Sequence, residues 1–362
     1  MSEGPAAHPR CRNALVIRPG ALGDTLLTLP VLQAIQEAWP QAEIDWMGNL
    51  AVLRWLPRRS VVRGVRSFEW PDLGTLFNTQ PRPSRKLQEY LGRYDLVLSY
   101  AAPPDSVFAH NLTPLISGTA VSWDARPGDH LREHMSVYLQ RPLVQLGIMP
   151  SDEFPSLALT QTDRAEAAQW WAAQRLGSGL AVAIHPGSGS RSKNWPANRF
   201  AELARTVMEQ LKARVLLVQG PADEDAVAGV TRALRDDQLV PVRDMPLPAL
   251  AAILERCSAY VGNDSGVSHL AAAIGVASLV IFGPTNPQVW APRGRQVRVV
   301  AANMRGPRDR GPGERWHGRP VEDVSVRATQ TALYDLLSSP QHEGSTNSMG
   351  SGNESRRNRA SR

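Results

Sequence analysis

The chain contains a polar segment, VGNDSGVSHLAAAIG over residues 261–275, whose residue types suit the binding of an anion. It begins like the end of a buried strand and continues as a helix of small residues, so Ser265 and Gly266 stand at the helix start. Backbone N–H groups at a helix start lack partners within the helix and attract anions, and glycine lets a ligand approach closely. His269 follows Ser265 by four residues and lies on the same helix face. Asp264 and Ser265 are also ordinary capping residues, so a cap and an anion site both remain open.

A second polar group, HPGSGSRSKNWP over residues 185–196, follows another apolar, strand-like run. Here His185 and Ser188 lie in a Gly/Ser loop, and Lys193 precedes a helix start. Exposed N–H groups, an ammonium group and a helix start together form a cradle for an anion such as a phosphate. The alternative is a solvated loop with an incidental lysine.

A carboxylate that could act as a general base is Asp24, at the end of the loop PGALGD. Gly20 and Gly23 permit a tight turn and a close approach of the backbone. The alternative is that Asp24 is an ordinary helix N-cap, although Leu27 stands where a capping box would need Glu or Gln. Neither G-x-G-x-x-G nor a Walker motif occurs, which disfavours a Rossmann dehydrogenase and a P-loop kinase.

The segment LLVQGPADEDA places two acidic residues, Asp223 and Glu224, directly after a further strand. Carboxylates in this position can accept hydrogen bonds from ribose hydroxyls. They are also typical of a first helical turn, where they interact favourably with the helix dipole. Both interpretations remain open at this point.

These groups must be positioned by a fold in which short apolar strands alternate with helical segments. Such alternation predicts βαβ units and mostly parallel sheets. We therefore expect an α/β protein of two tandem Rossmann-like, doubly wound domains around a central cleft, with ligands bound beyond the carboxyl ends of the strands. Pro30 is expected to bend or restart the first helix, and residues 134–148 are expected to form one helix. The expected boundaries are a flexible leader at 1–12, an N-terminal domain at 13–150, a linker at 151–163, a C-terminal domain at 164–338 and a disordered tail at 339–362.

The composition is that of an ordinary globular protein, with 42% hydrophobic and 20% charged residues. The 40 basic and 34 acidic residues give a net charge of +6, a mild bias towards anionic partners. Nucleic acid is the least favoured of these partners, because no basic blocks are interleaved with aromatics. Cys11 and Cys257 show no pairing pattern, which disfavours a disulfide or a zinc site. With no signal-peptide pattern and no run of roughly 20 apolar residues, we expect a cytoplasmic protein, and contact with a membrane surface remains open.

Four segments together resemble glycosyltransferase family 9, the lipopolysaccharide heptosyltransferase family. They are RPGALGDTLLTLPVL, IHPGSGSRSKNWPANRFAEL, GNDSGVSHLAAAIG and VIFGPTNPQVWAP, and the resemblance covers about residues 13–335. It implies a GT-B-type fold and transfer of a heptose, or a related sugar, from an ADP-activated donor to a lipid-linked lipopolysaccharide core oligosaccharide. The transfer would invert the anomeric centre and need no metal or cofactor, in agreement with the lack of a convincing D-x-D motif. Peripheral contact at the cytoplasmic face of the inner membrane would fit such an acceptor.

The resemblance also implies roles for individual residues. Asp24 would be the catalytic base in an acceptor-side N-terminal domain, and Lys193 would bind the donor phosphates. The ribose-binding acid would fall on Glu224, with Asp223 as the other register. The remaining donor-binding residues would be His185, Ser188, Asp264, Ser265, Gly266 and His269.

Two other functions are compatible with this architecture. A sugar-nucleotide epimerase or hydrolase would isomerise or release the sugar without an acceptor. A non-catalytic nucleotide-sugar-binding protein would bind the donor without turnover, although the presence of both Asp24 and Lys193 argues against a decayed site. The acceptor is the least defined partner. Candidates for contacting it, which could equally form a solvated face, are the Arg-rich loop 305–319 and the residues Arg54, Arg58, Arg59, Arg63 and Arg66.

Overall fold

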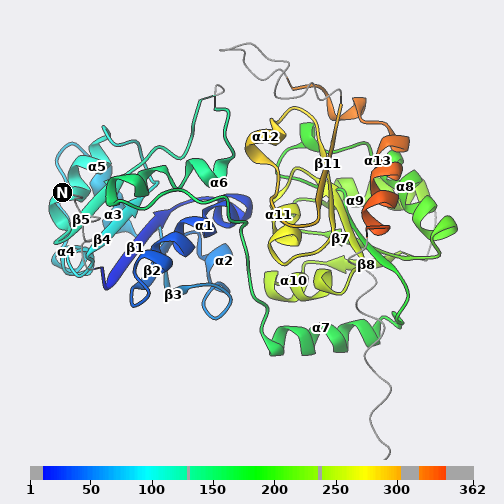
Figure 1. The fold of residues 1–362 in the computed structure, drawn as a ribbon, viewed down its shortest axis with the longest axis horizontal. Helices are drawn as coiled ribbons and strands as arrows, with labels where there is room; N and C mark the ends of the chain where they lie inside the picture. Colours follow the sequence, from blue (N-terminus) through cyan, green and yellow to red (C-terminus); the bar gives the residue numbers. More distant parts are fainter. Residues whose placement is uncertain (1–10, 129–130, 235–238, 303–317, 340–362) are drawn as a thin grey trace, which may run out of the picture.

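The computed structural model describes residues 11–128, 131–234, 239–302 and 318–339. Within these residues, the N-terminal half contains a five-stranded sheet in the order β3-β2-β1-β4-β5, and the C-terminal half a six-stranded sheet in the order β11-β10-β9-β6-β7-β8. All neighbouring strands in both sheets are parallel. Each sheet grows in both directions from its first strand, which confirms the predicted doubly wound arrangement. The two α/β units stand side by side, each with its own helices (Figure 1).

The elements of the N-terminal half have the following bounds. The strands are β1 (Asn13–Arg18), β2 (Glu43–Gly48), β3 (Val62–Ser67), β4 (Leu96–Ser99) and β5 (Thr119–Ser122). The α-helices are α1 (Leu22–Ala38), α2 (Leu50–Leu53), α3 (Pro71–Gly74), α4 (Arg85–Leu91), α5 (Val107–Leu112) and α6 (Met135–Tyr138). Short 3-10 helices occur at η1 (Thr75–Phe77), η2 (Thr113–Leu115) and η3 (Arg141–Leu146).

The elements of the C-terminal half follow the linker. The strands are β6 (Ala181–His185), β7 (Arg214–Gln219), β8 (Val240–Arg243), β9 (Ala259–Asn263), β10 (Ser278–Phe282) and β11 (Val297–Ala301). The α-helices are α7 (Gln161–Ala173), α8 (Ala197–Gln210), α9 (Glu224–Leu234), α10 (Leu247–Glu255), α11 (Gly266–Ala273), α12 (Pro287–Trp290) and α13 (Val326–Leu337). Short 3-10 helices occur at η4 (Arg191–Lys193) and η6 (Val321–Asp323).

The central strands of the C-terminal sheet are buried along their whole length. β6, β9 and β10 have every residue buried, because helices cover both faces of a parallel sheet and leave no solvent-facing side. Polar residues nevertheless end two of these strands, with His185 at the end of β6 and Asn263 at the end of β9. The carboxyl edge of the sheet is therefore the place where polar chemistry concentrates.

The two halves meet where α1 packs on α11, and buried apolar residues continue from one half to the other (Figure 1). Two glycines make this approach possible. A Cβ added at Gly266 would lie 2.9 Å from the Cβ of Leu22, and one added at Gly23 would lie 3.3 Å from the Cδ2 of His269. A side chain at Gly266 would therefore push the two helices apart.

Two local expectations need correction. Helix α1 runs unbroken through Pro30, which is buried between Leu29 and Val31, so packing on both sides outweighs the single hydrogen bond that proline removes. Residues 134–148 do not form one helix. They contain α6 and then η3, because Pro142 cannot donate the backbone hydrogen bond that would continue an α-helix.

The segment between the two halves has no helix or strand from residue 147 to residue 160, and α7 takes the last three residues of the expected linker. The linker contacts both halves, since the N–H of Leu157 donates to the carbonyl of Ala273 and that of Ala158 to the carbonyl of Arg59, both at 3.0 Å. Most of the expected leader and tail, and residues 305–317 of the Arg-rich loop, lie outside the described residues. In the part of the chain that is described, no helix has the length and apolar character to cross a bilayer.

Candidate active site

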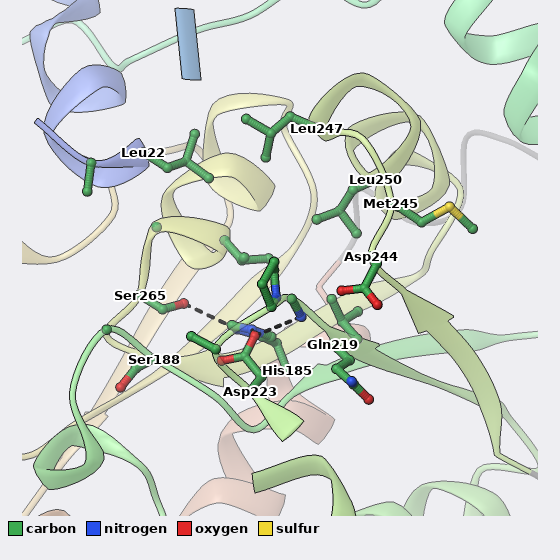
Figure 2. Close-up of a pocket in the computed structure, with 18 of the residues that line it drawn as sticks. Leu22, His185, Ser188, Gln219, Asp223, Asp244, Met245, Leu247, Leu250 and Ser265 are labelled. Carbon is green, nitrogen blue, oxygen red and sulfur yellow. Dashed lines mark hydrogen bonds and ion pairs between the residues drawn. The ribbon is translucent and has the colours of Figure 1, made fainter. Parts of the chain in front are cut away.

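A cavity of about 380 Å³ opens where the carboxyl ends of four strands of the C-terminal sheet meet the start of α1 (Figure 2). Its walls come from both halves of the chain: the loops that follow β6, β7, β8 and β9, and residues 21–23 of the N-terminal half. The strand order reverses between β6 and β9. Ligands of doubly wound sheets bind outside the carboxyl ends of the strands at such a reversal.

The cavity has an apolar end and a polar end. The polar end is formed by His185, Ser188 and Ser265, together with the first backbone groups of α11. Figure 2 shows Ser188 and Ser265 on the left, and Leu247, Leu250 and Met245 above and to the right of them. The apolar end is formed by Val218, Val242, Met245, Leu247 and Leu250. An apolar slot that ends at a helix N-terminus suits a ring system joined to an anionic group.

Ser265, and not Asp264, caps α11. The Oγ of Ser265 accepts the N–H of Ser268, while the carboxylate of Asp264 accepts the Nζ of Lys193 at 2.7 Å. Lys193 comes from η4 and is about one third exposed, and neither it nor Asp264 lines the cavity. The structure therefore places the ammonium group beside the start of α11, already paired with a carboxylate.

His185 and Asp223 form a buried pair on the cavity wall, with the His185 Nε2 2.9 Å from the Asp223 Oδ2. Burial raises the pKa of Asp223, but hydrogen bonds from His185 and from the N–H of Gly220 outweigh it and hold the pKa below its ordinary value. Gly187 leaves room for this carboxylate, because a Cβ there would overlap the Asp223 Oδ1. Asp223 is thus an ionised partner of His185.

Glu224, which the sequence favours as the ribose-binding acid, is the first residue of α9, is exposed and does not line the cavity. Sequence reasoning missed a third carboxylate, Asp244, which follows β8 and lies on the cavity wall beside Gln219 (Figure 2). Asp244 has a φ of 47°, in the left-handed region that non-glycine residues rarely adopt. A detectable signal was its place near the end of the strand-like segment LVPVRDM, since β8 ends at Arg243.

His269 lies at the contact between α1 and α11 and not on the cavity wall. Burial lowers its pKa to about 4, although the nearby carboxylates of Asp264 and Asp24 and a hydrogen bond with the backbone of Trp290 act in the opposite direction. His269 is therefore neutral at pH 7. Ser265 and His269 are four residues apart, as expected, but Ser265 lines the cavity and His269 does not.

Asp24 is the third residue of α1, so it is not the N-cap considered above. Its Oδ2 accepts the N–H of Ala21 at 3.1 Å, and its Oδ1 accepts the Nη2 of Arg18 at 2.9 Å. A Cβ at Gly20 would lie 2.7 Å from the Cβ of Asp24, so glycine is needed for this turn. The carboxylate is about one third exposed, directly after the residues of the N-terminal half that line the cavity.

Three of the arginines considered for the acceptor have partners within the chain. Arg59 pairs with Asp163, Arg63 pairs with Asp45 and Glu43, and the Arg66 guanidinium lies 4.3 Å from the ring centre of Tyr90. These contacts account for their positions without a ligand.

Comparison with known proteins agrees with this arrangement. The sequence model of glycosyltransferase family 9 (heptosyltransferase) matches residues 131–311. Over 313 residues the chain is 26% identical to lipopolysaccharide heptosyltransferase 1 of Pseudomonas aeruginosa, covering 78% of this chain and 81% of that protein. It is 24% identical over 314 residues to lipopolysaccharide heptosyltransferase 2 of Escherichia coli, covering 79% and 87%.

Solved structures confirm the GT-B-type fold. The crystal structure of a family 9 glycosyltransferase from Veillonella parvula superposes with a TM-score of 0.72 at 19% identity, covering 90% of this chain and 97% of the other. The E. coli ADP-heptose lps heptosyltransferase II superposes with a TM-score of 0.71 at 21% identity, covering 91% and 99%. A cavity between two Rossmann-like units, the family match over residues 131–311, which is half of the chain, and the relatives matched over most of their length agree: the chain belongs to glycosyltransferase family 9, the heptosyltransferases.

Proposed function

We propose that this chain transfers a heptose from ADP-heptose to a lipid-linked lipopolysaccharide core acceptor, with inversion and without a metal. The observation that carries the proposal is the cavity itself: an apolar slot and a helix start lie in one half, and residues 21–23 of the other half, directly before the anchored carboxylate of Asp24, complete the wall. The names of the relatives, which are lipopolysaccharide heptosyltransferases, support the sugar and the acceptor. The solved relative described as using ADP-heptose supports the nucleotide.

In this proposal the adenine occupies the apolar end of the cavity and the diphosphate lies at the start of α11. The backbone N–H groups from Ser265 onward and the hydroxyl of Ser188 would contact the phosphates. Lys193 would exchange Asp264 for a phosphate oxygen, a movement within reach of a flexible side chain. Asp264 then keeps Lys193 in place while the donor is absent.

For the ribose hydroxyls we propose Asp244 in place of Glu224. Both oxygens of a carboxylate are acceptors, and the Asp244 side chain lies at the cavity wall next to the apolar slot, where a ribose joined to a bound base would lie (Figure 2). Glu224 lies outside the cavity, and Asp223 is occupied by His185.

The chemical step proposed for Asp24 is removal of the proton from the acceptor hydroxyl. The acceptor oxygen then attacks the anomeric carbon, and the bond to the diphosphate breaks with its electron pair moving to the phosphate oxygen. Base catalysis of this kind contributes about 10²–10⁴-fold. Lys193 and the start of α11 stabilise the charge on the leaving diphosphate, a task that a metal ion performs in other glycosyl transfers.

The acceptor would reach Asp24 from the N-terminal half, with the enzyme in peripheral contact with the cytoplasmic face of the inner membrane. A lipid-linked acceptor places its saccharide at that surface, and the net charge of +6 favours an anionic membrane.

The test is nucleotide release from ADP-heptose with and without crude lipid-linked core acceptor, in buffer containing EDTA. Release that depends on the acceptor and resists EDTA supports the proposal, and the anomeric configuration of the product by NMR reports inversion. Nucleotide release without acceptor would identify a hydrolase, and sugar isomerisation an epimerase. Tight donor binding without turnover on any acceptor would identify a binding protein.

A further inference from the structure

A buried chain of hydrogen bonds connects Asp223 to the polar end of the cavity. The Asp223 Oδ2 lies 2.9 Å from the Nε2 of His185, and the Nδ1 of His185 lies 3.4 Å from the Oγ of Ser265 (dashed lines in Figure 2). All three side chains are more than nine-tenths buried, and all three line the cavity. The Ser265 hydroxyl alone is enough to cap α11, so the cap does not explain the buried His185 and Asp223.

The direction of each hydrogen bond follows from Asp223. As an ionised carboxylate it can only accept, so the Nε2 of His185 carries a hydrogen, and whenever the ring is neutral its Nδ1 is an acceptor. The Ser265 Oγ also lies 3.2 Å from the Ser268 Oγ, but a hydroxyl hydrogen turned to Ser268 would leave the buried Nδ1 without this donor. We therefore assign the Ser265 hydrogen to His185, while the Oγ accepts the N–H of Ser268. In this state Ser265 has no hydrogen left to offer an anion in the cavity.

We infer that His185 takes up a proton when the anionic donor binds, and that the imidazolium, paired with Asp223, frees the Ser265 hydroxyl to donate to the diphosphate. The inference rests on the proposed function, because ADP-heptose is the anion. The proton comes from solvent and binds the Nδ1 of His185, which becomes a donor to the Ser265 Oγ. One N–H bond thus forms on His185, and the Ser265 O–H turns to a phosphate oxygen without breaking.

The charges around this chain allow the uptake. The Tyr260 hydroxyl lies 3.0 Å from the Oγ of Ser268, and burial raises its pKa, so Tyr260 stays neutral. Asp264, next to Ser265, is paired with Lys193 before the donor binds, and its negative charge also favours a charged His185 once Lys193 has turned to a phosphate. Asp223 is the carboxylate hydrogen-bonded to His185 and positioned to stabilise its charged form.

His185 is a positioning residue in this scheme, since it acts on the donor through Ser265. Its positive charge supports the leaving diphosphate in addition to Lys193. Because binding consumes a proton, donor affinity must increase as the pH falls.

The experiment is titration calorimetry of the full chain with ADP-heptose in the absence of acceptor, at pH 7.5, in buffers that differ in ionisation enthalpy. ADP-heptose is a diphosphate diester without a group that titrates near this pH, so any proton exchange belongs to the protein. We expect uptake of up to about one proton per donor bound, the capacity of a single histidine. His185→Gln and Asp223→Asn should abolish the uptake, make affinity independent of pH between 6.5 and 8.5, and weaken binding about tenfold.

Ser188→Ala is the matched control: it removes a proposed phosphate contact that is not part of the hydrogen-bond chain, so it should weaken donor binding but retain the proton uptake per donor bound. If a buried variant does not fold, the pH dependence of wild-type affinity decides alone. Donor binding by the wild type without proton exchange overturns the relay and leaves the proposed transfer intact, as does uptake that persists in His185→Gln. Binding with uptake but no heptosyl transfer overturns the proposed function and supports the relay, whereas a chain that does not bind ADP-heptose overturns both.

Discussion

Arg18 and Asp24 form an ion pair that joins the end of β1 to the first turn of α1, with Nη2 and Oδ1 2.9 Å apart. Arg18 is buried, and its burial lowers its pKa from the ordinary value, while Asp24 favours the charged guanidinium. The second oxygen of Asp24 is held by the N–H of Ala21. The proposed base is therefore fixed by a strand and a helix together.

Replacing the base should affect turnover and not donor binding. Asp24→Asn should lower kcat by about 10²–10⁴-fold, because the acceptor hydroxyl loses its proton acceptor. The dissociation constant for ADP-heptose should change less than about threefold, since Asp24 contacts no donor group in the proposal. Single-turnover kinetics and calorimetry measure the two effects. Near-wild-type kcat in Asp24→Asn contradicts the assignment.

Arg18 should act through Asp24. Arg18→Gln should lower kcat about 10- to 100-fold at unchanged donor KM, because the carboxylate loses one of its two anchors. Arg18→Lys should restore part of the rate. The control is Arg191→Gln, which removes an exposed arginine whose partner is the exposed Asp225. A rise in donor KM without a change in kcat would place Arg18 in donor binding and not in positioning.

Removal of the Lys193 ammonium group should weaken donor binding. Lys193→Ala should weaken ADP-heptose binding at least about tenfold, because a charge-assisted hydrogen bond to phosphate is lost and Asp264 is left unpaired near the diphosphate. Lys86→Ala, at an exposed position of α4, should bind as the wild type does. Equal affinities of both variants would exclude Lys193 from the donor site.

Two variants distinguish Asp244 from Glu224 as the residue that binds the ribose hydroxyls. Asp244→Asn should weaken the binding of ADP about tenfold, because the lost acceptor faces the ribose hydroxyls. The same variant should weaken the binding of 2′,3′-dideoxy-ADP much less. Glu224→Gln is the matched control and should leave both affinities unchanged. The opposite result, with Glu224→Gln weakened and Asp244→Asn unchanged, would restore the assignment made from the sequence.

Stability should fall in acid because two histidines are buried in neutral form. Burial lowers the pKa of His134 and of His269 to about 4 each. In the unfolded chain these histidines bind protons below about pH 6.5, whereas in the folded chain they bind protons only near pH 4. The free energy of unfolding is therefore retained above about pH 7 and declines as the pH falls towards 4. At pH 5 the loss should be about 2 kcal/mol per histidine.

Urea unfolding at pH 7.5 and pH 5.0 measures this loss. His134→Gln and His269→Gln should each reduce the difference between the two pH values, whereas His110→Gln, at an exposed position, should not. A wild type whose unfolding free energy is the same at both pH values contradicts the buried neutral state of these residues.

Local pattern in the sequence was sufficient for several features. Apolar runs such as ALVIR and AYVG predicted strands, and the polar residues that follow them predicted the edge at which the cavity opens. The helix start at Gly266 was also predictable, because capping chemistry is local. Proline effects were predicted less well. At Pro30 the outcome depends on how tightly the surrounding residues pack, which a local pattern does not record. At Pro142 the chain follows the local rule that proline interrupts an α-helix.

By itself, then, the sequence determined the two doubly wound units, the family and the set of polar residues that stand after strands, since all of these depend on residue type and short spacing. Only the tertiary structure decided which of those residues share a cavity. It placed Asp223 and Asp244 on the wall and Glu224 outside it, and it placed His269 against Gly23. The reason is physical: these distances are set by strand order and by the packing of α1 on α11, which join residues more than 200 positions apart.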